Sequence, residues 1–190
     1  MLKLYMSMPT EAEQPRKQIL INAATENDLL GIKKILRATI RTPYGVGDVD
    51  ETEVQMELER ITRALSLPEE GKTLIARDQQ GEALGLAFFG KPDSRITDFT
   101  GSDPETTMEL RLLYLDPSKR GQGLGSYLLQ AAEDEMREKG TRKIELVSGP
   151  RYILIGSGRF YSKRGYSLVG TIENYFEGEY WAKVYQKELL

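Results

Sequence analysis

One segment constrains the fold of this chain more than any other: an apolar stretch that stops at Asp-Pro and leads into a glycine-rich turn. Residues 108–115 (MELRLLYL) are typical of a strand, and Asp116-Pro117 ends it because proline cannot donate to a β-ladder. The turn RGQGLG at residues 120–125 then precedes an amphipathic helix over 125–139. A strand, a glycine turn and a helix in this order predict a mixed α/β fold.

Hydrophobic periodicity predicts the rest of the architecture around this segment. Residues 1–16, with two prolines, are expected to be a loosely held lead-in. Residues 17–190 are expected to form a single domain without repeats or a linker. The glycine-, proline- and aspartate-rich stretch 91–105 is expected to be a surface loop. The expected elements are strand 18–22, helices 25–40 and 51–67, strands 73–76, 84–89 and 108–115, helix 125–139, strand 144–147, helix 158–163 and strands 166–172 and 181–189.

Composition excludes several kinds of chemistry. The chain contains no cysteine and no histidine, so disulfides, thiolate or histidine metal sites and a Ser-His-Asp triad are ruled out. Acid–base chemistry must therefore use carboxylates, tyrosines, lysines or water. A net charge of -3 gives no broad attraction to nucleic acid, and no segment approaches the length of a membrane span. A cytoplasmic protein with no nucleic-acid or membrane partner is expected.

The glycine turn has the features of an anion site. Glycines at 121, 123 and 125 let the backbone turn sharply and approach an anion closely. The helix that follows offers unpaired amides and the positive end of its dipole, and Arg120 adds a full charge. The spacing is neither the Walker lysine motif nor G-x-G-x-x-G, which weakens those two nucleotide-binding interpretations. The alternative is an ordinary glycine-rich strand-to-helix turn.

Residues 109–117 together with 120–125 resemble motif A of the GNAT superfamily of N-acetyltransferases. The sequence FYSKRGY at residues 160–166 resembles motif B of that superfamily, in the usual order and at a typical separation. The resemblance implies the GNAT fold over residues 18–189, a mixed, mostly antiparallel sheet of about seven strands with about four helices. It also implies acetyl-CoA as the co-substrate and no metal.

The resemblance assigns cofactor roles residue by residue. The backbone of Leu113, Tyr114 and Leu115 would pair with the pantetheine arm, while their side chains can still pack in the core. The loop would hold the pyrophosphate through Arg120 and through the amides of Gly121, Gln122, Gly123, Leu124, Gly125 and Ser126.

The resemblance also implies catalytic roles for Tyr161 and Glu109. Tyr161 matches the tyrosine that protonates the departing thiolate, and a phenol with a pKa near 10 is protonated at neutral pH. An alkylamine is only about one part in a few thousand neutral at pH 7, so a base is needed. Glu109 matches a glutamate that serves as that base in one branch of the superfamily. Glu145 on the next strand, or water, is an alternative to Glu109. The alternative for Tyr161, which we favour less, is a packing aromatic beside Phe160.

Two positions depart from the family pattern. The asparagine that many members carry shortly after the fifth strand is absent from residues 149–154, and Ser157 replaces an alanine. The substrate rim is expected in residues 41–50, 91–105 and 174–181. The last of these segments can either line a pocket or pack as a hairpin.

The sequence therefore predicts an enzyme that transfers an acetyl group from acetyl-CoA to a primary amine of a small molecule or amino acid. A monomer or homodimer is expected. The alternatives are a non-catalytic acyl-CoA-binding module on the same fold, an acetyltransferase acting on protein N-termini or lysines, and a nucleotide-phosphate binder such as a small kinase.

Overall fold

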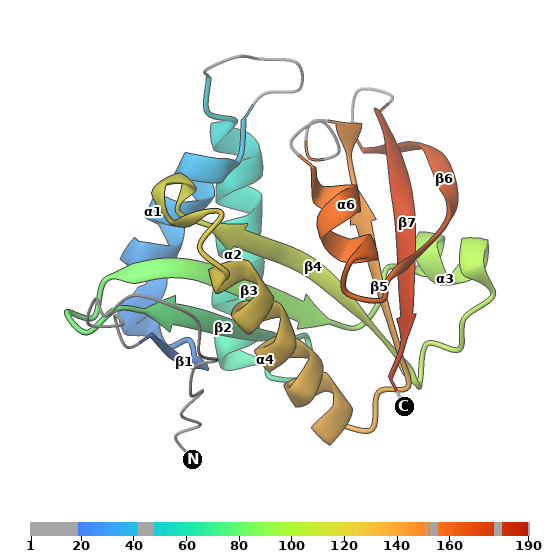
Figure 1. The fold of residues 1–190 in the computed structure, drawn as a ribbon, viewed down its shortest axis with the longest axis horizontal. Helices are drawn as coiled ribbons and strands as arrows, with labels where there is room; N and C mark the ends of the chain where they lie inside the picture. The colour runs from blue at the N-terminus through green and yellow to red at the C-terminus, as the bar shows by residue number, and fades with distance from the viewer. Residues whose placement is uncertain (1–18, 42–47, 151, 153–155, 177–179, 190) are drawn as a thin grey trace, which may run out of the picture. The chain divides into compact units, whose positions relative to one another are not determined.

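The computed structural model describes residues 19–41, 48–150, 152, 156–176 and 180–189 (Figure 1). The expected lead-in over residues 1–16 lies outside this range. The elements are β1 (Leu20–Ala23), the 3-10 turn η1 (Glu26–Asp28), α1 (Leu29–Thr39), α2 (Glu51–Ser66), β2 (Lys72–Arg77), β3 (Ala83–Gly90), α3 (Ser94–Thr100), β4 (Thr107–Leu115), η2 (Pro117–Lys119), α4 (Leu124–Glu138), β5 (Lys143–Ser148), α6 (Ser157–Ser162), β6 (Ser167–Phe176) and β7 (Tyr180–Glu188).

Seven strands form one hydrogen-bonded sheet in the order β1-β2-β3-β4-β5-β7-β6. The β4 and β5 strands are parallel, whereas the β1–β2, β5–β7 and β6–β7 pairs are antiparallel. This confirms the expected mixed, mostly antiparallel sheet. The described residues contain five α-helices, one more than expected.

The chain divides into two compact units. The first comprises residues 1–88 and 112–132, and the second comprises residues 89–111 and 133–190. Strands β3 and β4 and helix α4 contribute residues to both units. The single domain expected over residues 17–190 stays a prediction, and each unit is described by itself.

The first unit has an apolar core between its helices and strands. Helices α1 and α2 pack against each other (Figure 1). The expected capping box of Thr25 and Asp28 is present at the start of η1, which leads into α1, and in it the Thr25 amide donates to the Asp28 carboxylate at 2.7 Å. Asp50 caps α2 by accepting the Glu53 amide at 3.0 Å. Apolar side chains at helical and strand spacing then form the core: Ile32, Ile35, Leu36, Ile40, Val54, Ile61, Ala64, Ile75, Leu86, Phe88 and Leu112.

The second unit combines a small apolar cluster with buried polar groups. Its apolar cluster consists of Ile96, Tyr175, Ala182 and Val184. Helix α4 ends in this unit at Glu138, and Gly140, with a φ of 83°, gives the left-handed turn expected after it. The buried glutamates of this unit are described with the site below.

The surface loop expected over residues 91–105 is wrong in part, because α3 lies within it. Asp93 caps this helix by accepting the Arg95 amide at 2.9 Å, and Gly101 ends it with a φ of 67°. Ile96, on its inner side, is fully buried. The composition indicated a loop because the residues that cap a short helix at both ends are the same residue types that form turns.

Candidate active site

The glycine turn belongs to the first unit and is shaped by two left-handed residues. Gly121 and Gly123 have φ angles of 75° and 84°. A Cβ at Gly121 would meet nothing within 4 Å, so glycine is needed there for backbone conformation and not for space. Upstream, Asp116 accepts the Ser118 amide at 2.8 Å, and hydrogen bonds from Ser118 hold the pKa of the Asp116 carboxyl below its usual range.

The turn leads directly into α4, which begins at Leu124. The amides of Leu124 and Gly125 have no carbonyl one turn earlier in the helix to bond to, as is general for the first turn of a helix. The Ser126 amide instead donates to the Gly123 carbonyl at 2.9 Å. Residues 120–123 are exposed, so Arg120 and the loop backbone are open to a solute. An exposed cation beside the N-terminus of a helix is an arrangement that can hold an anion.

The strand before the turn approaches its neighbour closely. A Cβ on Gly85 of β3 would lie 2.9 Å from the Tyr114 carbonyl oxygen and 2.5 Å from the Leu115 side chain, so only glycine fits there. The Asp116 amide donates to the Leu84 carbonyl at 2.9 Å. In the described residues, the ladder between β4 and β5 runs from Thr107 to Glu109. The half-buried stretch Leu113–Leu115 follows the end of this ladder.

Tyr161 lies on α6 of the second unit within a group of aromatic rings. Its ring centroid is 5.1 Å from that of Phe160, 5.5 Å from that of Tyr166 and 6.1 Å from that of Tyr185. Burial raises the pKa of the Tyr161 phenol above its usual range, and Tyr152 adds a smaller effect in the same direction. The phenol is therefore protonated at neutral pH, as an acid must be.

Glu109 is 4% exposed and is held by groups of its own unit. Its Oε2 accepts the Asp93 amide at 3.0 Å and lies 3.4 Å from the Arg111 Nε. The Arg111 guanidinium also donates to the Lys91 carbonyl at 2.9 Å. These contacts connect the carboxylate to the segment that enters α3. A base role for Glu109 would require the amine to reach a carboxylate that is almost wholly enclosed.

Glu145, the alternative base, is fully buried beside it in the parallel ladder, where Glu109 and Glu145 are in register. Its Oε1 accepts three hydrogen bonds, from Thr100 at 2.6 Å, Ser102 at 2.7 Å and Gln186 at 2.7 Å. Among the described residues, its Oε2 has no hydrogen-bond partner. Three donors on one oxygen make Glu145 the centre of a polar network that joins α3, β5 and β7.

The expected substrate rim is described only in part. Residues 42–47 and 177–179 lie outside the described residues, as do 151 and 153–155 in the segment that departs from the family pattern. Ser157, the other departure, shares a 2.7 Å hydrogen bond with Ser148. Phe176 pairs with Tyr180 at the end of the β6–β7 ladder, and the Tyr175 side chain is 8% exposed. The described aromatic residues of this segment thus lie on the paired strands β6 and β7.

Two clusters in the second unit were not predicted. In the first, the Arg95 guanidinium lies 4.2 Å from the Tyr175 ring centroid and donates to the Tyr175 carbonyl at 2.8 Å, while the Tyr175 hydroxyl donates to Asp93 at 3.3 Å. The second cluster is centred on Glu133, a residue of α4 that is 2% exposed. The signal for Glu133 was its position four residues after Leu129, on the inward face of the helix.

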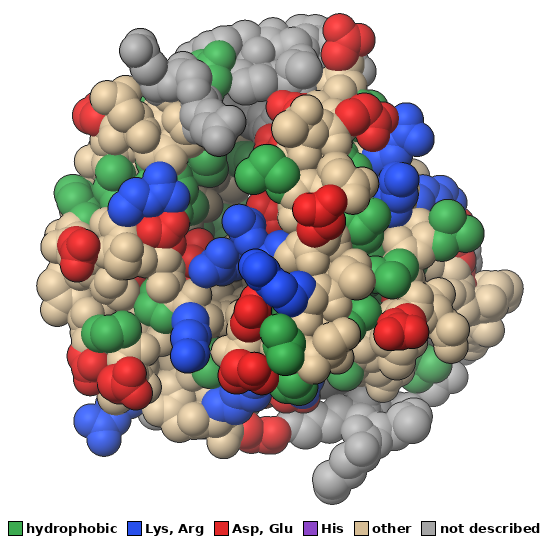
Figure 2. Space-filling model, turned by 180° about the vertical axis from the view of Figure 1, so that it is seen from behind, with side chains coloured by type: hydrophobic (Ala, Val, Ile, Leu, Met, Phe, Trp, Pro, Cys, Tyr) green, Lys and Arg blue, Asp and Glu red, His purple; other side chains and the backbone are tan. Residues whose placement is uncertain are grey.

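The described residues contain no cluster of three or more acidic side chains that could hold a metal ion. Within the same residues, no helix is long and apolar enough to cross a bilayer. On the face shown in Figure 2, Lys and Arg side chains lie next to Asp and Glu side chains.

Comparison with known proteins identifies the family. The family model described as the acetyltransferase (GNAT) family matches residues 29–166, which is more than half of the chain. The chain belongs to the GNAT acetyltransferase family. A curated relative, mycothiol acetyltransferase from Propionibacterium freudenreichii, is 31% identical over 103 residues, covering 54% of this chain and 30% of that protein. The match thus spans less than a third of the relative's length.

Solved structures share the fold at low sequence identity. One is a protein from Desulfovibrio desulfuricans described as an acetyltransferase of the GNAT family, with a TM-score of 0.71 and 18% identity over 90% of this chain and 98% of that one. Another is the PaiA N-acetyltransferase from Thermoplasma acidophilum in complex with coenzyme A, with a TM-score of 0.65 and 19% identity over 90% and 99%. These likenesses show the fold.

Proposed function

We propose that this chain transfers an acetyl group from acetyl-CoA to a primary amine of a small molecule or amino acid, by direct attack in a ternary complex. The observation that carries the proposal is the turn at residues 120–125. Its two left-handed glycines and the exposed Arg120 lead into the N-terminus of α4, in a chain of the GNAT family. Such a turn suits the pyrophosphate of coenzyme A.

The groups that would bind acetyl-CoA are mainly backbone groups. Arg120 and the amides of Gly121–Gly125 bind the pyrophosphate. The Ser126 amide contributes less, because it already donates to Gly123. The backbone of Leu113–Leu115 pairs with the pantetheine amides, as an added strand pairs with a sheet. This role is supported by the β4–β5 ladder, which ends at Glu109 and so does not extend to Leu113–Leu115 in the described residues.

The chemical step needs one acid and one base. The amine nitrogen attacks the thioester carbonyl carbon, the C–S bond breaks, and the thiolate takes a proton from the Tyr161 hydroxyl. Because its pKa lies above neutral pH, the Tyr161 phenol carries the proton that this step requires. The nitrogen loses its proton to a carboxylate or a water molecule. The enclosure of Glu109 and Glu145 favours water as the group that contacts the amine.

The acceptor class is inferred from the curated relative. The curated relative is named for mycothiol and not for a protein, which supports a small-molecule acceptor. We further propose that the chain acts in the cytoplasm as a monomer or homodimer, without a nucleic-acid or membrane partner.

A binding experiment with a matched pair of glycine variants tests the role of the turn. Gly121 in the turn and Gly81 in the β2–β3 hairpin both have left-handed φ angles, 75° and 82°, and in both cases an added Cβ would meet nothing within 4 Å. Gly121→Ala and Gly81→Ala should therefore destabilise the fold alike, by about 1 kcal/mol each. Only Gly121→Ala should weaken coenzyme A binding, by about tenfold, in titration calorimetry.

Turnover distinguishes the proposed enzyme from the other functions. Release of free coenzyme A from acetyl-CoA should depend on a primary amine from a panel of small amines and amino acids. Tight coenzyme A binding without turnover on any amine or peptide would instead indicate an acyl-CoA-binding module. Turnover on peptides alone would indicate a protein acetyltransferase, and ATP binding in preference to coenzyme A would overturn the proposal.

A further inference from the structure

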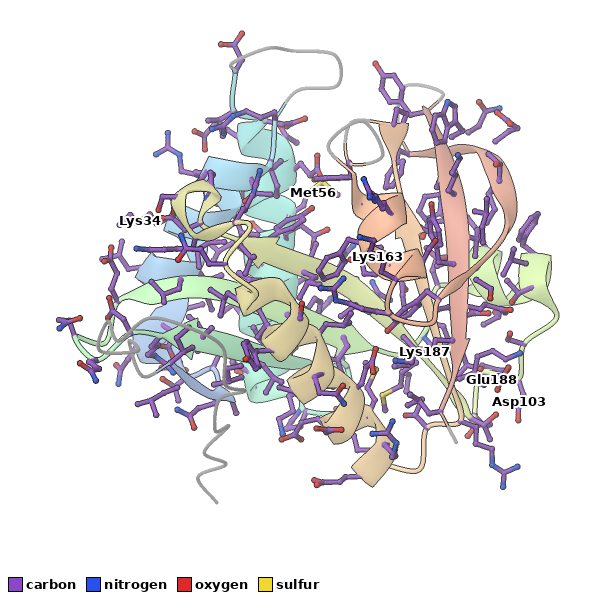
Figure 3. All side chains as sticks on the ribbon, viewed as in Figure 1. Lys34, Met56, Asp103, Lys163, Lys187 and Glu188 are labelled. Atoms are coloured by element: carbon purple, nitrogen blue, oxygen red, sulfur yellow. The ribbon has the colours of Figure 1, made fainter. Side chains whose placement is uncertain are left out.

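Glu133 joins three elements of the second unit through a buried carboxylate. Its Oε1 accepts the Tyr166 hydroxyl at 3.0 Å, and its Oε2 accepts the Lys187 ammonium at 2.6 Å. The Glu133 side chain is 2% exposed and that of Lys187 is 22% exposed. Figure 3 labels Lys187 on β7, while Glu133 belongs to α4 and Tyr166 directly precedes β6. Both carboxylate oxygens are thus bonded, as a buried charge requires.

Tyr166 is clamped at its far end by this carboxylate. Its side chain is 3% exposed. The hydrogen bond from its hydroxyl to Glu133 fixes the depth and the tilt of the ring more than the rotation of the ring about its long axis. The Lys187 ammonium also lies 5.4 Å from the Tyr166 ring centroid, which adds a cation–π contact. Ring packing alone would permit small shifts that a charge-assisted hydrogen bond prevents.

Tyr166 in turn contacts Tyr161 in two ways. The two rings meet edge to face with centroids 5.5 Å apart and an interplanar angle of 65°. The Tyr166 amide donates to the Tyr161 carbonyl at 3.2 Å, so the backbone of α6 is tied to the same residue. Helix α6 has only six residues, too few to hold its own geometry without such contacts.

We propose that Tyr166 and Glu133 are positioning residues for Tyr161: the Glu133 carboxylate fixes the Tyr166 hydroxyl, and the Tyr166 ring and amide hold Tyr161 in the orientation needed to protonate the leaving thiolate. The inference rests on the proposed function, in which Tyr161 is the acid. A proton donor acts only within hydrogen-bond reach, so a small displacement of its hydroxyl lowers the rate without changing how acetyl-CoA binds.

A double-mutant cycle on acetyl transfer tests the coupling. Tyr166→Phe removes one hydroxyl and keeps the ring. In the wild-type background it should lower kcat about five- to tenfold with the KM for acetyl-CoA unchanged. In a Tyr161→Phe background, where no phenol remains to be positioned, it should change kcat by less than about twofold. An equal fall in both backgrounds, or no fall in the wild type, would overturn the inference.

A second series keeps the inference testable if Tyr166→Phe folds poorly. Glu133→Gln retains an acceptor oxygen for the Tyr166 hydroxyl, whereas Glu133→Ala does not. Glu133→Gln should therefore keep more of the wild-type kcat than Glu133→Ala, and Glu138→Gln, at the exposed end of α4, is the matched control with unchanged kcat. Equal kcat for the two Glu133 variants contradicts the inference.

The outcomes also separate this inference from the proposed function. If Tyr161→Phe leaves kcat unchanged, the assignment of Tyr161 as the acid is wrong and the positioning role falls with it. If Tyr161→Phe lowers kcat but Tyr166→Phe acts equally in both backgrounds, only the positioning role is wrong.

Discussion

The two compact units differ in what they bury. The core of the first unit is built from Ile, Leu, Val and Phe side chains, and Thr73 is the single buried polar residue recorded among its described residues. The second unit buries three glutamates and several hydroxyl groups: Thr97, Ser102, Thr107, Glu109, Glu133, Thr141, Glu145 and Ser148. Apolar burial is non-directional, whereas buried carboxylates need specific donors at fixed positions.

This difference matches the division of the proposed roles. The turn at residues 120–125 works through backbone amides, so it needs a well-formed helix and strand but little side-chain chemistry. Tyr161 works through one hydroxyl whose position matters, and it lies in the unit that is tied together by directional bonds. We therefore expect the loss of one buried acceptor in the second unit to cost more than the loss of one buried methyl group in the first.

Truncating a buried glutamate should show the largest effect. Glu145→Ala leaves the donors on Thr100, Ser102 and Gln186 without their acceptor and should lower the free energy of unfolding by about 3–5 kcal/mol. Ile61→Val in the first core should cost only about 1 kcal/mol. Chemical denaturation of both variants measures this, and similar losses would remove the contrast between the units.

The next largest effect should be a loss of stability in the second unit at alkaline pH. Burial raises the pKa of Tyr161, Tyr166 and Tyr175 above that of an unfolded tyrosine. The Glu133 carboxylate raises the pKa of Tyr166 further, by its charge and its hydrogen bond. Their contribution to stability is therefore full below pH about 10 and is lost as the pH rises further. Phenolate absorbance should appear in two stages, with the late stage coinciding with unfolding. A single early transition for all tyrosines would contradict this.

The first unit offers a smaller, acid-sensitive effect. Burial alone would raise the pKa of Asp28, but hydrogen bonds from Arg77 and Thr25 outweigh it and hold the pKa below its usual range. The resulting stability is present above pH about 4 and is lost as the pH falls through the lowered pKa. Asp28→Asn should cost about 1–2 kcal/mol at pH 7.

Thermal denaturation across pH tests the Asp28 prediction. The gap between wild type and Asp28→Asn should narrow below pH about 4, where Asp28 of the unfolded wild-type chain takes up its proton before the folded one does. A gap that stays constant down to pH 2.5 would mean that Asp28 acts through its capping geometry and not through its charge.

The same contrast explains what could be predicted from sequence. Periodic apolar residues defined α1, α2 and the strands of the first unit within a few positions, because area burial leaves a repeating pattern. Helix α3 was missed because Asp93 and Gly101, which cap it, are typical of loops. The Glu145 network could not be predicted, since Thr100 and Gln186 lie more than 40 positions away in the sequence.

The candidate site, like the fold, could be predicted from the sequence only in part. The turn was visible as a local motif, because its glycines, Arg120 and the helix start are consecutive in sequence. The contacts behind Tyr161 were not visible, because Glu133 and Lys187 reach its neighbour Tyr166 from distant parts of the chain. Motif B indicated the tyrosine and gave no information on what holds it.

The most direct test of the central claim is the rate of acetyl-CoA-dependent acetylation by the wild-type chain and by Tyr161→Phe. Free coenzyme A and the acetylated amine would be measured together. The account predicts equal amounts of the two products, a kcat for Tyr161→Phe lower by about a hundredfold or more, and an unchanged KM for acetyl-CoA. Equal kcat values for the two proteins, or coenzyme A release without an acetylated amine, would contradict it.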